Sequence, residues 1–292
     1  MARCCSQPQR MAVCTAGRLT AGSCCGGWVA TQMGKLGWSV PSWEPSPSQG
    51  METQAFAGPV KFCRFSPDGR LFASTSCDCT IRLWDVAGAK CLRVLKGHQR
   101  SVETVSFSPD SRQLASGGWD KHVMLWEVQS GQMLRLLAGH RDSVQSSDFS
   151  PSRDCLATGS WDSTIRIWDL RAGTPAVFHQ ELEGHSGNIS CLCYSASGLL
   201  ASGSWDKTIH IWKPMTSSLL VQLKGHITWV KSIAFSPDEQ RLASGGYSHM
   251  VKVWDCNTGK CLETLKLLAG SPGCGPRLCL HPRRETLSVW SC

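Results

Sequence analysis

The sequence predicts an all-β protein built from repeated units, and three regularities support that prediction. Tryptophan recurs at steps of 42, 42, 44 and 42 residues, at Trp84, Trp126, Trp168, Trp212 and Trp254. A Gly-His pair recurs at steps of 42, 45 and 41, and a serine or threonine stands ten residues before each of the five tryptophans. A fixed period of this length indicates a repeat architecture. We therefore expect five units in register over residues 55–266.

Each unit contains four runs of strand length. In the second unit they read VETVSFS, RQLASGG, HVMLWEV and MLRLLAGH, which are apolar-rich and partly alternating. The turn after the first run carries Ser-Pro-Asp in three units, where the fixed φ of proline suits the second position of a tight turn. A glycine follows the tryptophan within a few residues in four units, where a hairpin loop needs a positive φ. Each unit is therefore predicted to be a four-stranded sheet.

Four-stranded units at this interval resemble the WD-repeat β-propeller family, whose repeats carry Gly-His near the start and Trp-Asp at the end. The ending here is Trp-Asp in the first, third and fifth units, Trp-Glu in the second and Trp-Lys in the fourth. The resemblance covers residues 55–266 and implies a β-propeller with five recognisable repeats. Most members close a ring of seven blades, so it also implies an incomplete seven-bladed ring, with a tightened five-bladed ring as the alternative.

The sequence on either side of the repeats departs from the pattern. Residues 1–54 form a Cys/Gly/Pro-rich extension that we expect to be irregular and disordered, because prolines interrupt any strand there. Residues 267–292 form a non-repeat tail without a Gly-His pair or a hairpin signal. An open arc would leave apolar blade surface in water, so something must close or cap it. One hypothesis is an alternative transcript or imperfect gene model, a truncated form with no independent function.

Composition argues against several functional classes. Net charge is +8, but the repeats hold only a small basic surplus and no basic run, so no direct binding to nucleic acid is predicted. Apolar runs are too short for a membrane span and no secretory signal is evident, so we expect an intracellular protein, cytoplasmic or nuclear. The 17 cysteines lack the spacing of metal ligands and are interpreted as reduced thiols. We therefore expect neither a metal nor a cofactor.

The resemblance assigns a structural role to four repeated polar positions. In the family, the Gly-His histidine, a strand hydroxyl, a turn aspartate and the strand tryptophan form a hydrogen-bonded chain, here called the tetrad. The matching residues are His98, Ser116, Asp120 and Trp126 in the second unit, His140, Thr158, Asp162 and Trp168 in the third, and His185, Ser202, Asp206 and Trp212 in the fourth. Phe56 replaces the histidine of the first unit, and Ser248 replaces the aspartate that would follow His226 in the fifth. We expect those two units to be looser, because a buried polar network is rigid only when every member is satisfied.

The serine, histidine and aspartate of each unit also match the residue types of a hydrolase triad. Because the same trio recurs in each unit, we interpret it as structural and predict no catalytic residue. The sequence contains no GxSxG, HExxH or GxxxxGK[ST] motif. A propeller enzyme, the alternative, would need unlike ionisable groups converging on the central channel. The sequence therefore predicts a non-enzymatic protein with no small-molecule substrate.

A second set of positions faces the narrower mouth of the propeller in the family. It comprises the aromatic residues Trp119, Trp161, Trp205, Tyr247 and Trp229, and the inner-strand residues Lys61, Glu103, Gln145, Ser190 and Lys231. Tryptophan and tyrosine are frequent interface anchors, so we treat this set as candidate partner-binding residues. The alternative is that each ring shields the hydrogen-bonded network of a neighbouring blade.

The resemblance thus implies a scaffold that presents its narrow face to protein or peptide partners. An aromatic surface suits a partner that bears arginine, lysine or methyl-lysine, through cation–π contacts. Two roles stay open, a histone-tail reader in a chromatin complex and a cytoplasmic or ciliary assembly platform. The fold alone does not identify the partner.

Overall fold

The computed structural model describes residues 56–152, 155–171, 178–248 and 250–266, together with three short strands outside them. Those strands are β1 (Cys24–Cys25), β22 (Arg277–Leu280) and β23 (Leu287–Trp290). Apart from one short 3-10 turn, η3 (Pro214–Thr216), the regular structure in these ranges is β-strand, which confirms the all-β prediction. Within the same ranges, no helix is long and apolar enough to cross a membrane.

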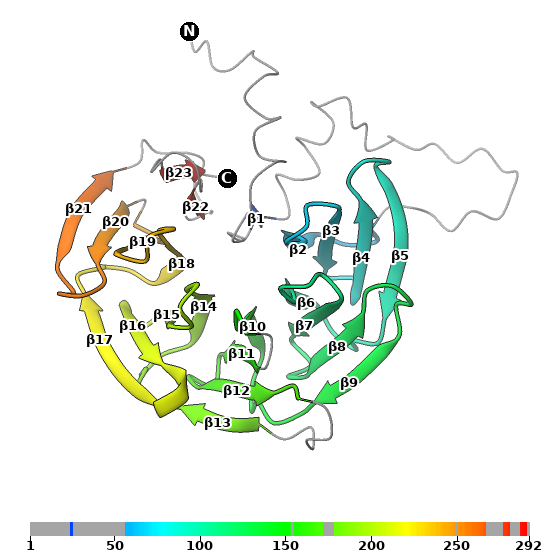
Figure 1. Ribbon diagram of the computed structural model, residues 1–292, viewed down its shortest axis with the longest axis horizontal. Helices are drawn as coiled ribbons and strands as arrows, with labels where there is room; N and C mark the ends of the chain where they lie inside the picture. The colour runs from blue at the N-terminus through cyan, green and yellow to red at the C-terminus, as the bar shows by residue number, and fades with distance from the viewer. Residues whose placement is uncertain are drawn as a thin grey trace, which may run out of the picture.

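The five units fold as five blades, each a meander of four consecutive antiparallel strands around a common centre (Figure 1). The first blade holds β2 (Val60–Phe65), β3 (Leu71–Ser76), β4 (Thr80–Asp85) and β5 (Lys90–Lys96), and the second holds β6 (Val102–Phe107), β7 (Gln113–Gly118), β8 (Val123–Glu127) and β9 (Met133–Leu137). The third holds β10 (Val144–Phe149), β11 (Cys155–Ser160), β12 (Ile165–Asp169) and β13 (Phe178–Leu182), and the fourth holds β14 (Ile189–Tyr194), β15 (Leu200–Ser204), β16 (Thr208–Lys213) and β17 (Ser218–Lys224). The fifth holds β18 (Val230–Phe235), β19 (Arg241–Gly246), β20 (Met250–Asp255) and β21 (Cys261–Lys266). In every blade the first strand lies innermost and the fourth outermost (Figure 1).

The Ser-Pro-Asp sequence builds the turn between the first two strands. In the first blade, the backbone N–H of Gly69 donates to the carbonyl of Ser66, and the backbone N–H of Leu71 donates to Ser66 Oγ, both at 2.9 Å. Gly69 has a φ of +74°, in the left-handed region that glycine adopts at least cost. The serine hydroxyl accepts the same bond at Ser108 and Ser236, so this turn is set by local sequence in three blades.

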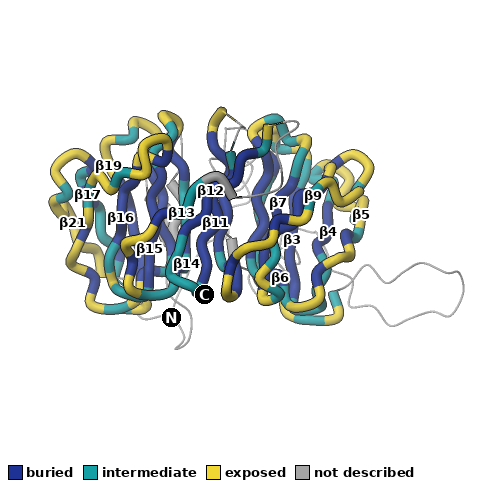
Figure 2. The backbone as a smooth tube through the Cα atoms, turned by 90° about the horizontal axis from the view of Figure 1, so that it is seen from below, coloured by how far each residue is buried: buried dark blue, intermediate teal, exposed yellow. Residues whose placement is uncertain are grey.

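The apolar core lies between neighbouring blades. Val123 and Leu125 of the second blade, for example, pack against Val144, Leu156 and Trp168 of the third. Three further clusters join the other neighbouring pairs in the same manner. Figure 2 shows the consequence, since inner strands are buried and the outermost strands and turns are exposed. Each blade therefore depends on its neighbours for burial, as expected of a repeat protein.

The described blades form an open arc (Figure 1). Trp84 of the first blade is half-buried, whereas the matching tryptophans of the other four blades are at most 3% exposed. At the opposite flank Leu265 is 43% exposed, although the matching leucines of the first four blades are at most 3% exposed. The blades thus have the arrangement predicted for an incomplete ring, with one half of an inter-blade interface at each flank.

Three strands outside the five blades were not predicted. β1 pairs antiparallel with β2, through Cys24 and Cys63 among others, and so extends the first sheet. β22 and β23 form an antiparallel pair, and β22 lies against β18 and β19 of the fifth blade. These runs are two to four residues long, too short for a periodic signal. The rest of both extensions lies outside the described residues, so the expected disorder stays a prediction.

Candidate functional site

The tetrad residues lie within hydrogen-bonding distance of one another in the second, third and fourth blades. In the third blade, Asp162 Oδ2 lies 2.8 Å from His140 Nδ1, and His140 Nε2 lies 2.8 Å from Thr158 Oγ1. Trp168 Nε1 then donates to Thr158 Oγ1 at 2.8 Å. The same three contacts measure 2.7, 2.7 and 2.9 Å in the second blade and 2.7, 2.8 and 2.8 Å in the fourth.

The aspartate of each tetrad also holds the neighbouring turn. Asp162 accepts from the backbone N–H of Arg141 and of Thr164, both at 2.9 Å, and from the Thr164 hydroxyl at 2.7 Å. Burial by itself would raise the pKa of Asp162. The hydrogen bond from His140, the electrostatic interaction with His140, and the hydrogen bonds from Arg141 and Thr164 together lower that pKa below its ordinary value. The carboxylate is therefore the stable form, and it ties the loop before the first strand to the turn after the second.

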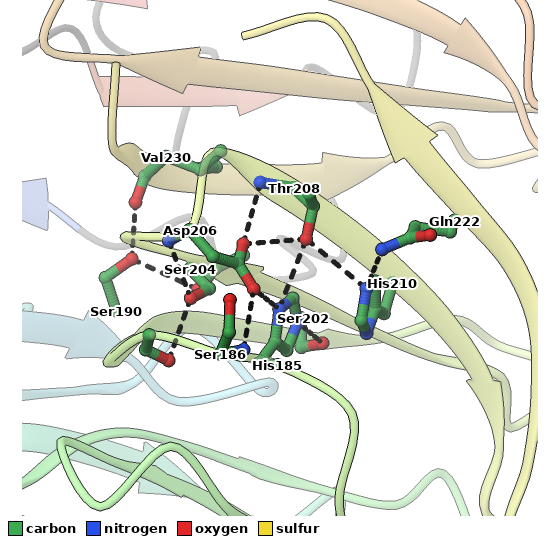
Figure 3. Close-up of polar contacts among 12 residues, drawn as sticks. His185, Ser186, Ser190, Ser202, Ser204, Asp206, Thr208, His210, Gln222 and Val230 are labelled. Carbon is green, nitrogen blue, oxygen red and sulfur yellow. Dashed lines mark hydrogen bonds and ion pairs between the residues drawn. The ribbon is translucent and has the colours of Figure 1, made fainter. Parts of the chain in front are cut away.

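The fourth blade extends this chain with a second histidine (Figure 3). The ring of His210 stacks on that of His185, with centroids 3.7 Å apart and planes 10° apart. Gln222 Nε2 lies 2.9 Å from His210 Nε2, and Thr208 Oγ1 lies 3.3 Å from the same atom. Burial, aided by the neighbouring His185, lowers the pKa of His210 to about 4. His210 is therefore neutral near pH 7, which permits the close stacking.

We expect stability to fall as the pH drops from about 6.5 to about 4. The pKa values of His210 and His226 are lowered to about 4 in the folded chain from an ordinary value of 6.5. Between these pH values the unfolded chain therefore binds protons that the folded chain does not bind. Their contribution is complete above pH 6.5 and is lost as the pH falls through the folded value. Urea unfolding at several pH values across this range gives the dependence of the unfolding free energy on pH. The slope of that dependence should be smaller in His210→Gln than in the wild type, by the equivalent of about one bound proton. Equal slopes for the variant and the wild type would contradict the assignment.

The first and fifth units retain only part of the tetrad. In the first, Trp84 Nε1 donates to Ser74 Oγ at 2.8 Å, and the ring of Phe56 lies 6.4 Å from that of Trp84. In the fifth, Ser244 Oγ contacts both His226 Nε2 at 2.6 Å and Trp254 Nε1 at 2.7 Å. The matching histidine nitrogen bonds an aspartate in the three intact blades, whereas the buried His226 Nδ1 has no hydrogen-bond partner among the residues that the structure describes.

The five predicted aromatic residues form one continuous row across four blades. Centroid distances are 4.8 Å for Trp119–Trp161, 5.4 Å for Trp161–Trp205, 4.2 Å for Trp205–Trp229 and 5.5 Å for Trp229–Tyr247. The Trp205–Trp229 pair is stacked, with planes 4° apart. Four of the rings follow the second strand of a blade and Trp229 precedes the first strand of the fifth, so in a meander all five lie at the same edge. We call this set the aromatic row.

Members of the aromatic row differ in exposure. Trp119, Trp229 and Tyr247 are each about two-fifths exposed, at 39%, 41% and 39%. Trp161 and Trp205 are half-buried, and Trp205 Nε1 is buried with no hydrogen-bond partner in the described part of the chain. The two half-buried rings therefore agree in part with the alternative that each ring shields the hydrogen-bonded network of a neighbouring blade. The other three rings present apolar surface to solvent.

The predicted inner-strand residues have different local roles. Glu103 Oε1 accepts from Trp119 Nε1 at 2.8 Å and lies 4.0 Å from Lys61 Nζ. Lys231 Nζ lies 5.6 Å from the centroid of the Tyr247 ring. Gln145 Nε2 donates to Ser143 Oγ at 2.8 Å, and Ser190 Oγ of the fourth blade donates to the carbonyl of Val230 in the fifth. The structure thus brings Lys61, Glu103 and Lys231 to the aromatic row, whereas Gln145 bonds beside its own strand and Ser190 joins two neighbouring blades.

One ion pair between inner strands was not predicted from the sequence. Arg64 of β2 donates to Asp148 Oδ1 of β10 at 2.7 Å and to the carbonyl of Ser147 at 3.4 Å, bypassing the second blade. The backbone N–H of Tyr194 in β14 donates to Asp148 Oδ2 at 2.8 Å. Arg64 and Asp148 each occupy the fifth position of their strand. Opposite charges at the same position of two repeats are therefore the sequence signal from which this ion pair could have been predicted.

Comparisons with known proteins find the same repeat. The family model described as "WD domain, G-beta repeat" matches residues 50–85, 89–127, 131–169, 177–213 and 217–255. WD repeat-containing protein 38 of Homo sapiens is 91% identical over 66 residues, which cover 23% of this chain and 21% of that relative. Its Mus musculus counterpart is 76% identical over 72 residues, covering 25% and 24%. Small ribosomal subunit protein RACK1y of Oryza sativa subsp. japonica is 32% identical over 117 residues, covering 39% and 32%. The alignments thus span about a fifth to a third of these curated relatives.

Proposed function

We propose, from the premise that this chain belongs to the WD40 repeat family, that it is a non-enzymatic scaffold which docks proteins on the aromatic row. Proteins of this family act in general as protein-interaction scaffolds. The observation that carries the proposal is the continuous contact among five aromatic rings from four blades. Aromatic residues with partly exposed faces are typical of the energetically dominant part of protein interfaces.

Burial of the repeated Ser/Thr, His and Asp side chains supports a structural reading of that trio. The four Gly-His histidines are at most 8% exposed, and the hydroxyl residues that bind them are fully buried. In the intact tetrads the hydroxyl also accepts from tryptophan, which a catalytic nucleophile awaiting substrate would not need. Three near-identical copies in one chain provide no distinct site for a reaction.

The chemistry of the aromatic row favours a partner with an arginine, lysine or methyl-lysine side chain. Lys231 Nζ lies 5.6 Å from the centroid of the Tyr247 ring, and this contact supports the choice of a cationic partner. At the other end, Glu103 lies beside Trp119 and would supply a carboxylate for a bound cation. A histone tail in a chromatin complex is one such partner, and a basic segment in a cytoplasmic or ciliary assembly is the other.

Alanine substitutions in the aromatic row should abolish partner capture. We expect Trp161→Ala combined with Trp205→Ala to lose capture while its melting temperature stays within a few degrees of the wild type. Trp229→Ala provides a second variant, because its exposed ring should cost less stability. The matched control is Met215→Ala, which removes an 87% exposed side chain between the third and fourth strands of the fourth blade, at the opposite edge.

Capture by the immobilised full chain, quantified by mass spectrometry, gives the measurement. Partners retained by the control and lost from both row variants support the proposal. A basic peptide from such a partner should bind at least about tenfold more weakly after its arginines and lysines are replaced by glutamine. Unfolding of both row variants would assign the rings to structure, and unchanged capture by folded variants would refute docking there.

A further inference from the structure

Three polar side-chain atoms without partners gather in the fifth blade. His226 Nδ1, Thr228 Oγ1 and Ser248 Oγ are buried and make no hydrogen bond within the described residues. A methyl group placed on Gly246 would meet the carbonyl oxygen of Trp229 at 2.6 Å and would lie 3.4 Å from both His226 Nδ1 and Thr228 Oγ1, so these two side-chain atoms lie together beside Gly246. Buried polar groups are normally paired, so three unpaired ones at one place indicate a missing partner.

The intact blades show what that partner is. In the second, third and fourth blades a carboxylate oxygen lies 2.7–2.8 Å from histidine Nδ1. The same oxygen accepts from the backbone N–H of the residue after the histidine, at 2.9–3.1 Å. The fifth blade keeps both donor positions, at His226 and Ile227, but Ser248 stands where the aspartate would be. The serine side chain is too short to bring an oxygen to that position.

Distances in the hydrogen-bond chain favour one nitrogen of His226 as the carrier of its proton. Trp254 Nε1 donates to Ser244 Oγ at 2.7 Å, and the Ser244 hydroxyl has two acceptors within reach, His226 Nε2 at 2.6 Å and the carbonyl of Lys252 at 3.5 Å. The much shorter contact takes the hydroxyl proton, so Ser244 donates to His226 Nε2. Nε2 is then an acceptor, and the ring proton of the neutral histidine resides on Nδ1. His226 therefore directs an N–H toward the unfilled position.

Charge near this position favours an anion. Burial and the ammonium of Lys252 lower the pKa of His226 to about 4, so the histidine is neutral near pH 7. Lys252 Nζ lies 5.9 Å from the ring centroid of Trp254, the tryptophan of this tetrad. The position thus combines neutral N–H and O–H donors with a nearby positive charge, as a carboxylate requires.

The position lies next to the end of the aromatic row. Trp229 directly follows Thr228, and Tyr247 directly precedes Ser248, with both rings about two-fifths exposed. We propose that the fifth blade binds a carboxylate in the place that aspartate fills in the three intact tetrads, and that a docked partner supplies it from an aspartate or glutamate side chain. The identity of this donor rests on the proposed function, whereas the carboxylate site itself does not.

Formate is the probe for the site. In thermal unfolding of the full chain at constant ionic strength, replacing chloride by 0.1 M formate should raise the melting temperature by about 2–4 °C for a dissociation constant of about 10 mM. Ser248→Asp, which restores the aspartate, should melt higher without formate and should not respond. Ser248→Ala keeps the space and the donors of His226, Ile227 and Thr228, so it should still respond to formate. Equal shifts in wild type and Ser248→Asp, or no shift in the wild type, would overturn the site.

A second measurement needs no variant. The ¹⁵N resonance of His226 Nδ1 in the wild-type chain should shift with formate concentration, and a resonance that does not move would refute the site. For the partner, Ser248→Asp should weaken capture by at least about tenfold, since its own carboxylate occupies the position. A normal formate response with unchanged capture would overturn the partner's carboxylate as donor, while loss of capture only in the aromatic-row variants would leave the proposed function intact.

Discussion

Replacing Asp148 with alanine is expected to lower the free energy of unfolding by about 3 kcal/mol. The Asp148 carboxylate accepts from Arg64 at 2.7 Å and from the backbone N–H of Tyr194 at 2.8 Å, which joins the first, third and fourth blades. Without this carboxylate, the guanidinium of Arg64 loses its ion-pair partner although the Arg64 side chain is only 13% exposed. The loss should lie at the lower end of the range for removing one partner of a buried ion pair, because both side chains retain some contact with solvent.

Urea unfolding monitored by tryptophan fluorescence measures this effect. Asp142→Ala is the matched control, because Asp142 belongs to the same blade and is exposed. Arg64→Met combined with Asp148→Leu should recover much of the loss, since neither charge is then unpaired. A change below about 1 kcal/mol in Asp148→Ala would show that the inter-blade pair contributes little.

Asp162→Ala should destabilise the chain by about 1–3 kcal/mol. The Asp162 carboxylate accepts four hydrogen bonds, from His140 Nδ1, the N–H of Arg141, and the N–H and hydroxyl of Thr164. Its removal leaves buried donors unsatisfied, including that of His140, which is 6% exposed. The fifth blade already lacks this carboxylate at Ser248, so Ser248→Ala should cost much less.

Chemical denaturation of both variants at pH 7 tests the comparison. The pKa of Asp162 is lowered in the folded chain by its hydrogen bonds, so its stabilisation is present above the ordinary pKa near 3.8 and is lost as the pH falls below it. The difference between Asp162→Ala and the wild type should therefore narrow in acid. An unchanged denaturation midpoint for Asp162→Ala at pH 7 would contradict a stabilising role for the tetrad.

The repeat made most of the fold predictable. Trp84 and its four counterparts fixed the register of the units, and Ser-Pro-Asp located the first turn of three blades. These signals are local or periodic, so they can be read without knowing which blades touch. The open arc was also predictable, because five units of this length are fewer than the family's usual seven.

Contacts between blades could not be predicted in the same way. Arg64 and Asp148 are 84 residues apart and lie in repeats that are not consecutive, so no local pattern links them. The aromatic row was foreseen as a set of positions, but the stacking of Trp205 on Trp229 depends on how two blades pack. Ser248 was noted as a departure from the pattern, yet only the buried neighbours His226 and Thr228 show that its site lacks a partner.

The most direct test of docking on the aromatic row is hydroxyl-radical footprinting of the full chain with and without a captured partner. Labelling of Trp119, Trp229 and Tyr247 should decrease on binding, because these rings are exposed in the free chain. Labelling of Met215 and Met133, which are 87% and 50% exposed away from the row, should not change. Protection of the two methionines with unchanged labelling of the three rings would place the partner elsewhere and contradict the account.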